Sequence, residues 1–149
     1  MISKIIVPTD GSKTAKKAAA YAVELAKQLQ ASIVILNVVD KRSLIAQTIP
    51  ASEAPRRTIE PIDYYLKEAA EVITGDIKKL CDKNGVESNI SIKTGHPVDM
   101  IVKEAKRSKA DLIVMGSHGR SALSAVVLGS VSYGVIHHDT KIPVLIVRG

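Results

Sequence analysis

The strongest constraint on the fold is a set of short apolar runs that recur between helical segments. Residues 5–7, 31–39, 112–115 and 142–147 are each rich in consecutive Ile, Val and Leu. Such near-continuous runs are typical of parallel strands that are buried on both faces. Residues 86–93 alternate apolar and polar side chains instead, which predicts a half-exposed strand at an edge of the sheet.

Four helices are predicted between these strands, because apolar residues recur there at spacings of three and four. The first lies near residues 13–29, the second begins near Pro61 and ends before Gly85, the third follows Pro97, and the fourth begins at Ser130. The residues expected to face the core are Ala15, Ala18, Ala19, Ala22, Val23, Ala26 and Leu29, then Ile62, Leu66, Ala69, Ile73, Ile77 and Leu80, then Ile101, Val102 and Ala105, and finally Val131, Val135 and Ile136.

This alternating order predicts an α/β fold: an open, doubly wound (Rossmann-like) sheet of five parallel strands with helices on both faces. The 149 residues, 46% of them hydrophobic, suffice for one ordinary domain with a packed core, spanning residues 1–149. Residues 41–60 break the rhythm and contain Pro50 and Pro55. A connection of that length predicts a variable loop that is either an ordered flap or mobile.

Composition excludes several classes of protein. A lone cysteine, Cys81, leaves no internal disulfide and no thiolate metal cluster, and it fits a reducing cytoplasm. No apolar stretch approaches the roughly 20 residues of a membrane span. The net charge of +6 permits an anionic partner, but the basic residues are scattered without interleaved aromatics, which makes nucleic-acid binding unlikely. We therefore expect a cytoplasmic protein without a membrane partner.

The most informative motif follows the fourth predicted strand. Met115 precedes the spacing Gly-x2-Gly-x9-Gly-Ser, formed by Gly116, Gly119, Gly129 and Ser130. Glycine lets the backbone turn off the strand and approach a ligand without a Cβ. The amides of residues 130–132 would then form the N-terminus of a helix, which attracts phosphate. The hydroxyls of Ser130 and Ser132 add donors or cation ligands.

The end of the first strand, Pro8-Thr9-Asp10, supplies the expected other half of this site. Asp10 is suited to accept ribose hydroxyls or to help hold a divalent cation, and alternatively it is a turn or helix-capping residue. Val38 and Val39 end the second strand and offer an apolar wall and backbone groups to a purine, or are simply core.

Two further candidates lie inside the glycine motif. His118 is placed to touch phosphate and Arg120 to screen its charge, although both are equally explained as solvated loop residues. The sequence lacks the P-loop, the Gly-x-Gly-x-x-Gly fingerprint of dinucleotide binders, and the His-Glu-x-x-His and Cys-x-x-Cys metal motifs. No metal-binding residues and no catalytic residues are assigned.

The chain resembles the universal stress protein family over essentially its whole length. The resemblance is carried by Ile-Val-Pro-Thr-Asp-Gly-Ser near the start, by residues 111–120, by Leu-Gly-Ser-Val-Ser at 128–132 and by the closing Pro-Val-Leu-Ile-Val. The glycine motif marks the family's ATP-binding subclass. The resemblance implies strand order 3-2-1-4-5, ATP between the first and fourth strands, and a homodimer, often through the last strand, here 143–147. The residues that it places on the nucleotide are Pro8, Asp10, Val38, Met115, Gly116, Gly119, Gly129, Ser130, Val131 and Ser132.

Three functions remain open at this point. The first is a nucleotide-dependent switch in a stress response that binds ATP together with Mg²⁺. The second is an enzyme, a slow Mg²⁺-dependent ATPase or nucleotidyl transferase, although the sequence offers no clear catalytic base. The third is a dimeric interaction module without a nucleotide. The sequence does not distinguish ATP from AMP, ADP or cyclic AMP, and it names no stress and no protein partner.

Overall fold

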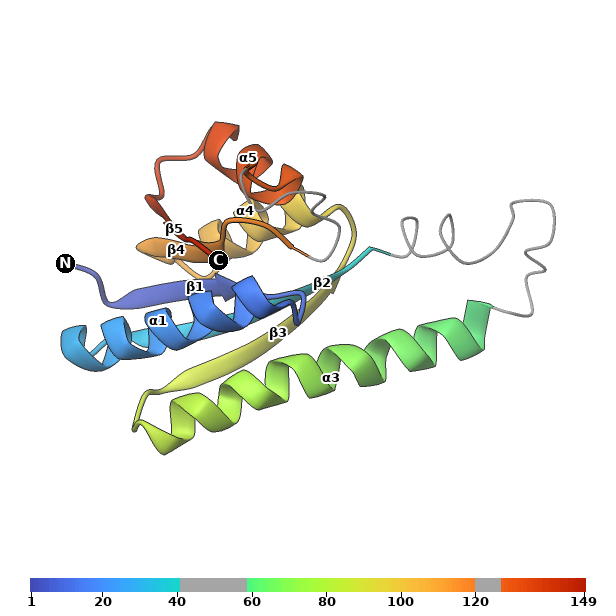
Figure 1. Cartoon of the computed structure of the whole chain (residues 1–149), viewed down its shortest axis with the longest axis horizontal. Coiled ribbons are helices and arrows are strands. Elements are labelled where there is room, and N and C mark those ends of the chain that lie inside the picture. The colour runs from blue at the N-terminus through green and yellow to red at the C-terminus, as the bar shows by residue number, and fades with distance from the viewer. Residues whose placement is uncertain (41–58, 120–126) are drawn as a thin grey trace.

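The chain forms a five-stranded parallel sheet with helices on both faces (Figure 1). The structure is a computed structural model and describes residues 1–40, 59–119 and 127–149. The elements in chain order are β1 (Lys4–Pro8), α1 (Lys13–Leu29), β2 (Ser32–Val39), α3 (Ile59–Lys83), β3 (Ser88–Thr94), α4 (Pro97–Arg107), β4 (Leu112–Gly116), α5 (Ser130–His137) and β5 (Val144–Val147).

The strand order is β3-β2-β1-β4-β5, and all four pairings are parallel. β1 therefore lies at the centre, with Ile5 opposite Ile33 of β2 and Leu112 of β4. This confirms the fold class and the order that the family resemblance implied. It also confirms the edge position of the alternating strand, because β3 pairs with β2 alone among the described strands.

Two apolar layers hold the helices against the sheet. On one face, α1 and α3 cover Ile5, Val7 and Ile33, and the alanines of α1 let that helix lie close to the strands. On the other face, α4 and α5 cover Ile6 and Leu36. Figure 1 shows the two helix pairs on opposite sides of the sheet. The chain thus leaves β1 toward one face and leaves β4 toward the other, which makes the ends of these two strands a topological switch point.

The helices begin where the sequence provides a cap or a rigid first residue. Ser12 caps α1, and its side chain accepts a hydrogen bond from the amide of Ala15 at 3.2 Å. Gln30 ends that helix in the left-handed region at φ 56°. Pro97 occupies the first position of α4, where a missing amide hydrogen costs no helical hydrogen bond.

Several details differ from the sequence prediction. α3 begins at Ile59 rather than near Pro61, and residues 41–58 of the predicted loop lie outside the described residues. Leu29 and Ile136 were expected in the core but are 42% and 43% exposed. Leu29 is the last residue of α1 and Ile136 lies in the last turn of α5, where the helix ends leave their side chains partly in solvent.

The buried face of α3 is centred one position later than predicted. Ala70, Thr74, Ile77 and Cys81 are its most buried residues. Thr74 is tolerated there because its hydroxyl donates to the carbonyl of Ala70 at 2.8 Å. Burial raises the pKa of the Cys81 thiol, so this cysteine behaves as a core residue. Within the part of the chain that the structure describes, no helix is long and apolar enough to cross a membrane.

Candidate functional site

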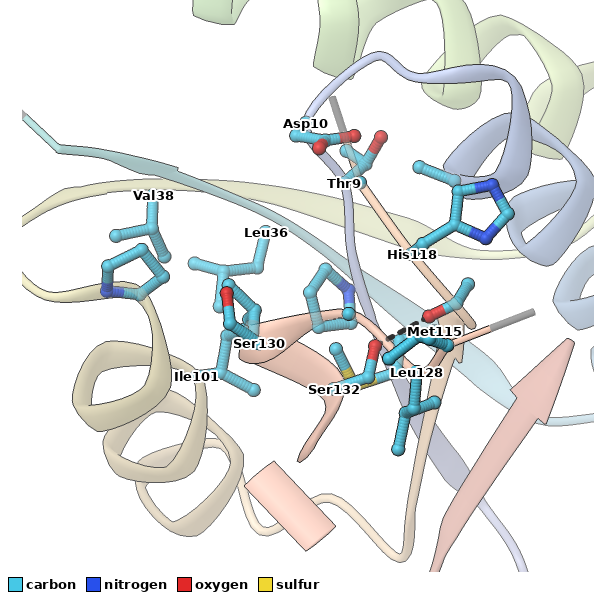
Figure 2. Close-up of a pocket in the computed structure, with 18 residues that line it drawn as sticks. Thr9, Asp10, Leu36, Val38, Ile101, Met115, His118, Leu128, Ser130 and Ser132 are labelled. Atoms are coloured by element: carbon cyan, nitrogen blue, oxygen red, sulfur yellow. Dashed lines mark hydrogen bonds between the residues drawn. The ribbon is translucent and has the colours of Figure 1, made fainter. Parts of the chain in front are cut away.

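A cavity of about 510 Å³ opens at the carboxyl ends of β1 and β4, at the switch point of the sheet (Figure 2). This volume is within the range of about 300–1,000 Å³ that is usual for small-molecule sites. The lining residues come from the ends of three strands, from the starts of α1, α4 and α5, and from the segments beside Gly119 and Val127. Among the described residues, those lining it are Pro8, Thr9, Asp10, Ala15, Leu36, Val38, Pro97, Ile101, Met115, Gly116, His118, Gly119, Val127, Leu128, Gly129, Ser130, Val131 and Ser132.

Backbone and side-chain hydrogen bonds fix the wall that β1 contributes. The amide of Thr9 donates to the carbonyl of Leu36 at 2.8 Å, and the side chain of Asn37 donates to the carbonyl of Thr9 at 2.8 Å. The carboxylate of Asp10 accepts from the amide of Ser12 at 2.9 Å, which is a turn of the Asx type. Asp10 is therefore a turn residue whose carboxylate also lines the cavity.

The loop after β4 is held by helices from both faces of the sheet. The hydroxyl of Thr14, in α1, donates to the carbonyl of His118, and the hydroxyl of Ser132, in α5, donates to the carbonyl of Gly116 at 2.7 Å. The amide of Gly129 donates to the carbonyl of Ser117 at 2.7 Å, so the two ends of the glycine motif meet. The Ser132 hydroxyl was expected to bind a ligand, but it donates to a carbonyl of the protein instead, and Ser132 is 3% exposed.

The three motif glycines serve close packing inside the protein. None of them has a positive φ. A Cβ on Gly116 would lie 2.9 Å from the backbone carbon of Thr14, and one on Gly129 would lie 2.9 Å from the Cα of His118. A Cβ on Gly119 would collide with the Asp10 carboxylate. The motif therefore lets β4, α1 and the loop before α5 touch, which brings their backbones to the edge of the cavity.

The N-terminus of α5 forms an electropositive part of the cavity wall. Gly129 caps this helix with extended backbone and has no side chain to bind the first amides. The amides of Ser130, Val131 and Ser132 are the first three of the helix, which have no partner within a helix. They add to the positive end of the helix dipole at the cavity wall.

One end of the cavity is apolar. Leu36, Val38 and Ile101 lie together on one side in Figure 2, with Ser130 among them in this view, while Asp10 and His118 lie on the other. Leu36 is fully buried and Ile101 is 3% exposed, so the apolar end is a continuation of the core. Such a surface suits a flat, weakly polar group.

The cavity contains little fixed charge. Asp10 is the one carboxylate on its wall, and no Lys or Arg lines it among the described residues. A phosphate there would be bound by amides and the helix dipole instead of by a cationic side chain. No group of three or more His, Cys, Asp or Glu side chains able to hold a metal ion occurs within residues 1–40, 59–119 and 127–149.

Most of the sequence-predicted site residues meet in this cavity. Those that line it are Pro8, Thr9, Asp10, Val38, Met115, Gly116, His118, Gly119, Gly129, Ser130, Val131 and Ser132. Val39 does not line it, and its carbonyl accepts from the amide of Gly95 at 3.0 Å. It follows Val38 in an extended strand, so its side chain points to the other face. Arg120 lies outside the described residues.

Sequence reasoning missed six lining residues, which are Ala15, Leu36, Pro97, Ile101, Val127 and Leu128. Pro97 and Ile101 could have been found from the sequence. The carboxyl ends of all the parallel strands share one edge of the sheet, and the helix that directly follows the third strand begins at that edge. Leu36 gave no signal, because a buried strand residue that reaches a cavity has the same sequence pattern as one that does not.

Similar proteins place the chain in a known family. The universal stress protein family profile matches residues 1–148. The universal stress protein YxiE of Bacillus subtilis is 35% identical over 149 residues, which cover 99% of this chain and all of that protein. The universal stress protein MJ0577 of Methanocaldococcus jannaschii is 34% identical over 157 aligned residues, covering 99% of this chain and 96% of the relative.

Solved structures agree with this assignment. The structure of MJ0577 superposes with a TM-score of 0.84 at 31% identity, covering 99% of this chain and 96% of that one. A universal stress protein in complex with cyclic AMP superposes with a TM-score of 0.71 at 26% identity, covering 98% and 97% of the two chains. With a sheet of the same order, a matching profile and relatives above 30% identity over nearly all of its length, the chain belongs to the universal stress protein family.

Proposed function

We propose that the protein binds ATP in the cavity at the ends of β1 and β4 and acts as a nucleotide-dependent switch. The observation that carries the proposal is the pairing, within one cavity of about 510 Å³, of an apolar end with a helix N-terminus. A nucleotide has the same two-part character, a flat base and a phosphate chain. The cyclic AMP complex of a structural neighbour supports a nucleotide as the ligand class.

The phosphates are assigned to the α5 end. The amides of Ser130, Val131 and Ser132 donate to phosphate oxygens, and the helix dipole stabilises their charge. The Ser130 hydroxyl adds a donor. A bound Mg²⁺ would be held by the phosphates themselves, with Asp10 as the nearest protein carboxylate on the cavity wall.

The base is assigned to the apolar end. Leu36, Val38 and Ile101 contact its faces, and Asp10, at the start of the opposite wall, accepts from the ribose hydroxyls. The switch function is favoured because hydrogen bonds from Thr14 and Ser132 connect residues 116–118 to α1 and α5, so a ligand bound at this wall would act on both helices. Asp10 and His118 also line the cavity, so turnover is tested directly by measuring phosphate release.

The phosphate end is tested by removing one amide without disturbing the helix. Ser130→Pro places proline at the first position of α5, which it tolerates, and the preceding Gly129 already has ψ 155°, the region that proline demands of its neighbour. The control is Ser130→Ala, which removes the hydroxyl and keeps the amide. We expect calorimetry to show ATP binding about tenfold weaker in Ser130→Pro than in Ser130→Ala, the equivalent of one charge-assisted hydrogen bond.

The base end is tested by two adjacent residues that face opposite sides of the sheet. Val38→Gln puts a polar group into the apolar end, whereas Val39→Gln leaves the cavity wall unchanged. Adenosine, AMP and ATP should all bind more weakly to the first variant and within about twofold of normal to the second. Equal effects of the two substitutions, or no ATP binding to protein freed of bound nucleotide, with and without Mg²⁺, would refute the assignment.

Turnover is a separate test of the switch. Linear release of phosphate from ATP at roughly 1–100 per second would show that the protein is an enzyme instead of a switch.

We also propose that residues 1–149 act as one nucleotide-binding domain in the cytoplasm and that two copies associate through β5. β5 is an apolar strand at the edge of the sheet. The carbonyls of Pro143 and Val147 accept hydrogen bonds from β4, and bonding residues alternate along a parallel strand. The backbone groups of Val144 and Ile146 therefore point away from β4. Ile146→Pro should convert a dimer into a monomer in light scattering. A monomeric mass for the unaltered protein at micromolar concentration would rule out the dimer.

A further inference from the structure

A second concave region lies beside the edge strand β3, on the face covered by α4. Its volume is about 650 Å³, and it is formed by residues 89–93 of β3, by the second half of α4 and by Lys4 at the start of β1. It shares no described residue with the nucleotide cavity. We call this region the β3 groove.

The β3 groove has a strong positive charge. Four cationic side chains line it, Lys4, Lys93, Arg107 and Lys109, and Glu104 is the one carboxylate among its described residues. Arg107 pairs with Glu104 and Lys93 Nζ lies 4.0 Å from the same carboxylate, so four positive charges against one negative charge leave the described residues of the groove with a net charge of +3. The groove consequently selects for an anionic occupant.

The carboxylate of Glu104 is already fully used. It is 2% exposed, accepts two hydrogen bonds from the Arg107 guanidinium and accepts a third from the Ser91 hydroxyl at 3.1 Å. These bonds, the Arg107 bond first, hold the pKa of the Glu104 carboxyl below its ordinary value. The same contacts fix α4 above β3 and hold the guanidinium in place, while its side chain stays 63% exposed.

The backbone of β3 has an unpaired edge next to this groove. The amide of Ile33 donates to the carbonyl of Glu87, and the amide of Gly95 donates to the carbonyl of Val39. In a parallel ladder the residues that bond to the neighbour alternate, so odd-numbered residues of β3 face β2. The amides and carbonyls of Ile90, Ile92 and Thr94 therefore point outward, where a further strand can pair with them. The outward carbonyl of Ser88 already accepts a hydrogen bond from Lys78 Nζ at 3.1 Å.

The two faces of this edge differ in chemistry. Asn89, Ser91 and Lys93 lie opposite Val34, Leu36 and Val38 and face the groove. Ile90 lies opposite Ile35 on the other face, and it is 43% exposed although it is a large apolar residue. An added strand would place every second side chain beside the cations and the others beside Ile90.

We propose that the β3 edge binds an extended segment of a partner protein in which acidic and apolar residues alternate. The segment pairs with the outward backbone groups of β3, its acidic side chains enter the β3 groove, and its apolar side chains cover Ile90. A second copy of β3 is a poor occupant, because pairing two such edges brings together two grooves that each carry a net positive charge.

The test uses a capped peptide of alternating Val and Glu, as long as the seven residues of β3, with a Val–Lys peptide of the same length as its control. Fluorescence anisotropy should show binding of the acidic peptide only, weakening several-fold when salt is raised from about 0.05 M to about 0.5 M. Absence of binding by the acidic peptide would overturn the proposal.

Strand pairing is separated from simple charge attraction by two variants at one position. Ile90→Pro removes an outward amide that β2 does not use, whereas Ile90→Thr keeps that amide. We expect peptide binding at least about tenfold weaker in Ile90→Pro than in Ile90→Thr, with thermal unfolding used to verify that both are folded. Equal binding by both folded variants would mean attraction by charge alone and would refute strand addition.

A second pair of variants tests the groove and does not depend on proline. Lys93→Gln removes one groove cation, and Lys13→Gln removes an exposed cation from α1, on the opposite face. The first should weaken binding of the acidic peptide several-fold and flatten its salt dependence, and the second should leave both unchanged. Equal effects of the two substitutions would show that only the net charge of the protein matters.

Discussion

The cavity and the β3 groove are similar in size, but different chemical groups line them. The cavity wall at the phosphate end consists of backbone, brought close by Gly116, Gly119 and Gly129. The groove is lined by four cationic side chains, two of which, Lys93 and Arg107, contact the buried carboxylate of Glu104. The stability of the first should depend on steric fit between backbone segments, and the stability of the second should depend on charge. Four predictions test that contrast.

The largest effect is expected at Gly116. A side chain there meets the backbone of Thr14, which cannot move without displacing the start of α1. Gly116→Val should therefore lower the free energy of unfolding by about 3 kcal/mol, at the upper end of the usual cost of overpacking. Equilibrium urea unfolding measures it. A change below about 1 kcal/mol would mean that the wall is pliable and that the contrast with the groove fails.

A smaller loss is expected from Glu104→Gln. The amide keeps the shape of the side chain but gives Arg107 a weaker acceptor and presents its own donor to Ser91 and Arg107. Loss of this buried charge-assisted pair should cost about 1–2 kcal/mol of unfolding free energy. Glu87→Gln, at an exposed site before β3, is the control and should change stability by less than about 0.5 kcal/mol. Equal effects at both positions would remove Glu104 as the organiser of the groove.

Acid should abolish the difference between wild type and Glu104→Gln. The pKa of Glu104 is lower in the folded protein, chiefly through the hydrogen bond from Arg107. The folded state therefore binds fewer protons at this site than the unfolded state does. The stabilisation is present above the ordinary glutamate pKa and is lost as the pH falls through that value toward the folded pKa. Unfolding curves between neutral and acidic pH should therefore converge. A difference that stays constant with pH would assign the loss to packing.

The smallest effect should be a gain, at a glycine outside both regions. Gly75 lies within α3, and a Cβ on it would meet no atom within 4 Å. Gly75→Ala should raise the unfolding free energy by about 0.5–1 kcal/mol, because alanine loses less backbone entropy in a helix. Thermal unfolding suffices to measure it. Destabilisation here would indicate that glycine at this position serves a contact with another molecule.

The fold was accessible from the sequence because its signals are local. The continuous apolar runs of β1, β2 and β4 each predict a strand that is buried on both faces. The alternating run of β3 predicts a strand at an edge of the sheet. The strand order itself followed from the family resemblance. What could not be predicted is where each helix face is centred: the buried Thr74 depends on a hydrogen bond to Ala70 that spacing does not reveal.

The candidate sites divide in the same way. The phosphate end of the cavity was predictable because its residues form one motif, although the motif's spacing did not show that its glycines pack against Thr14, His118 and Asp10. The β3 groove was not predicted. Lys4, Lys93 and Arg107 come from three separate elements, and only the register of β3 on β2 and the position of α4 bring them together.

One end of the cavity is lined by main-chain atoms and the other by side chains, and this difference affects how the protein can diversify in evolution. At the α5 end, the wall presents main-chain atoms, which point mutations cannot exchange, and a side chain added at Gly116, Gly119 or Gly129 collides with a neighbouring segment. At the other end, Leu36, Val38 and Ile101 are ordinary side chains that one codon change can enlarge, shrink or make polar. If the cavity holds a nucleotide as proposed, descendants of this sequence are therefore free to change the wall that contacts the base while they keep the main-chain groups that contact phosphate.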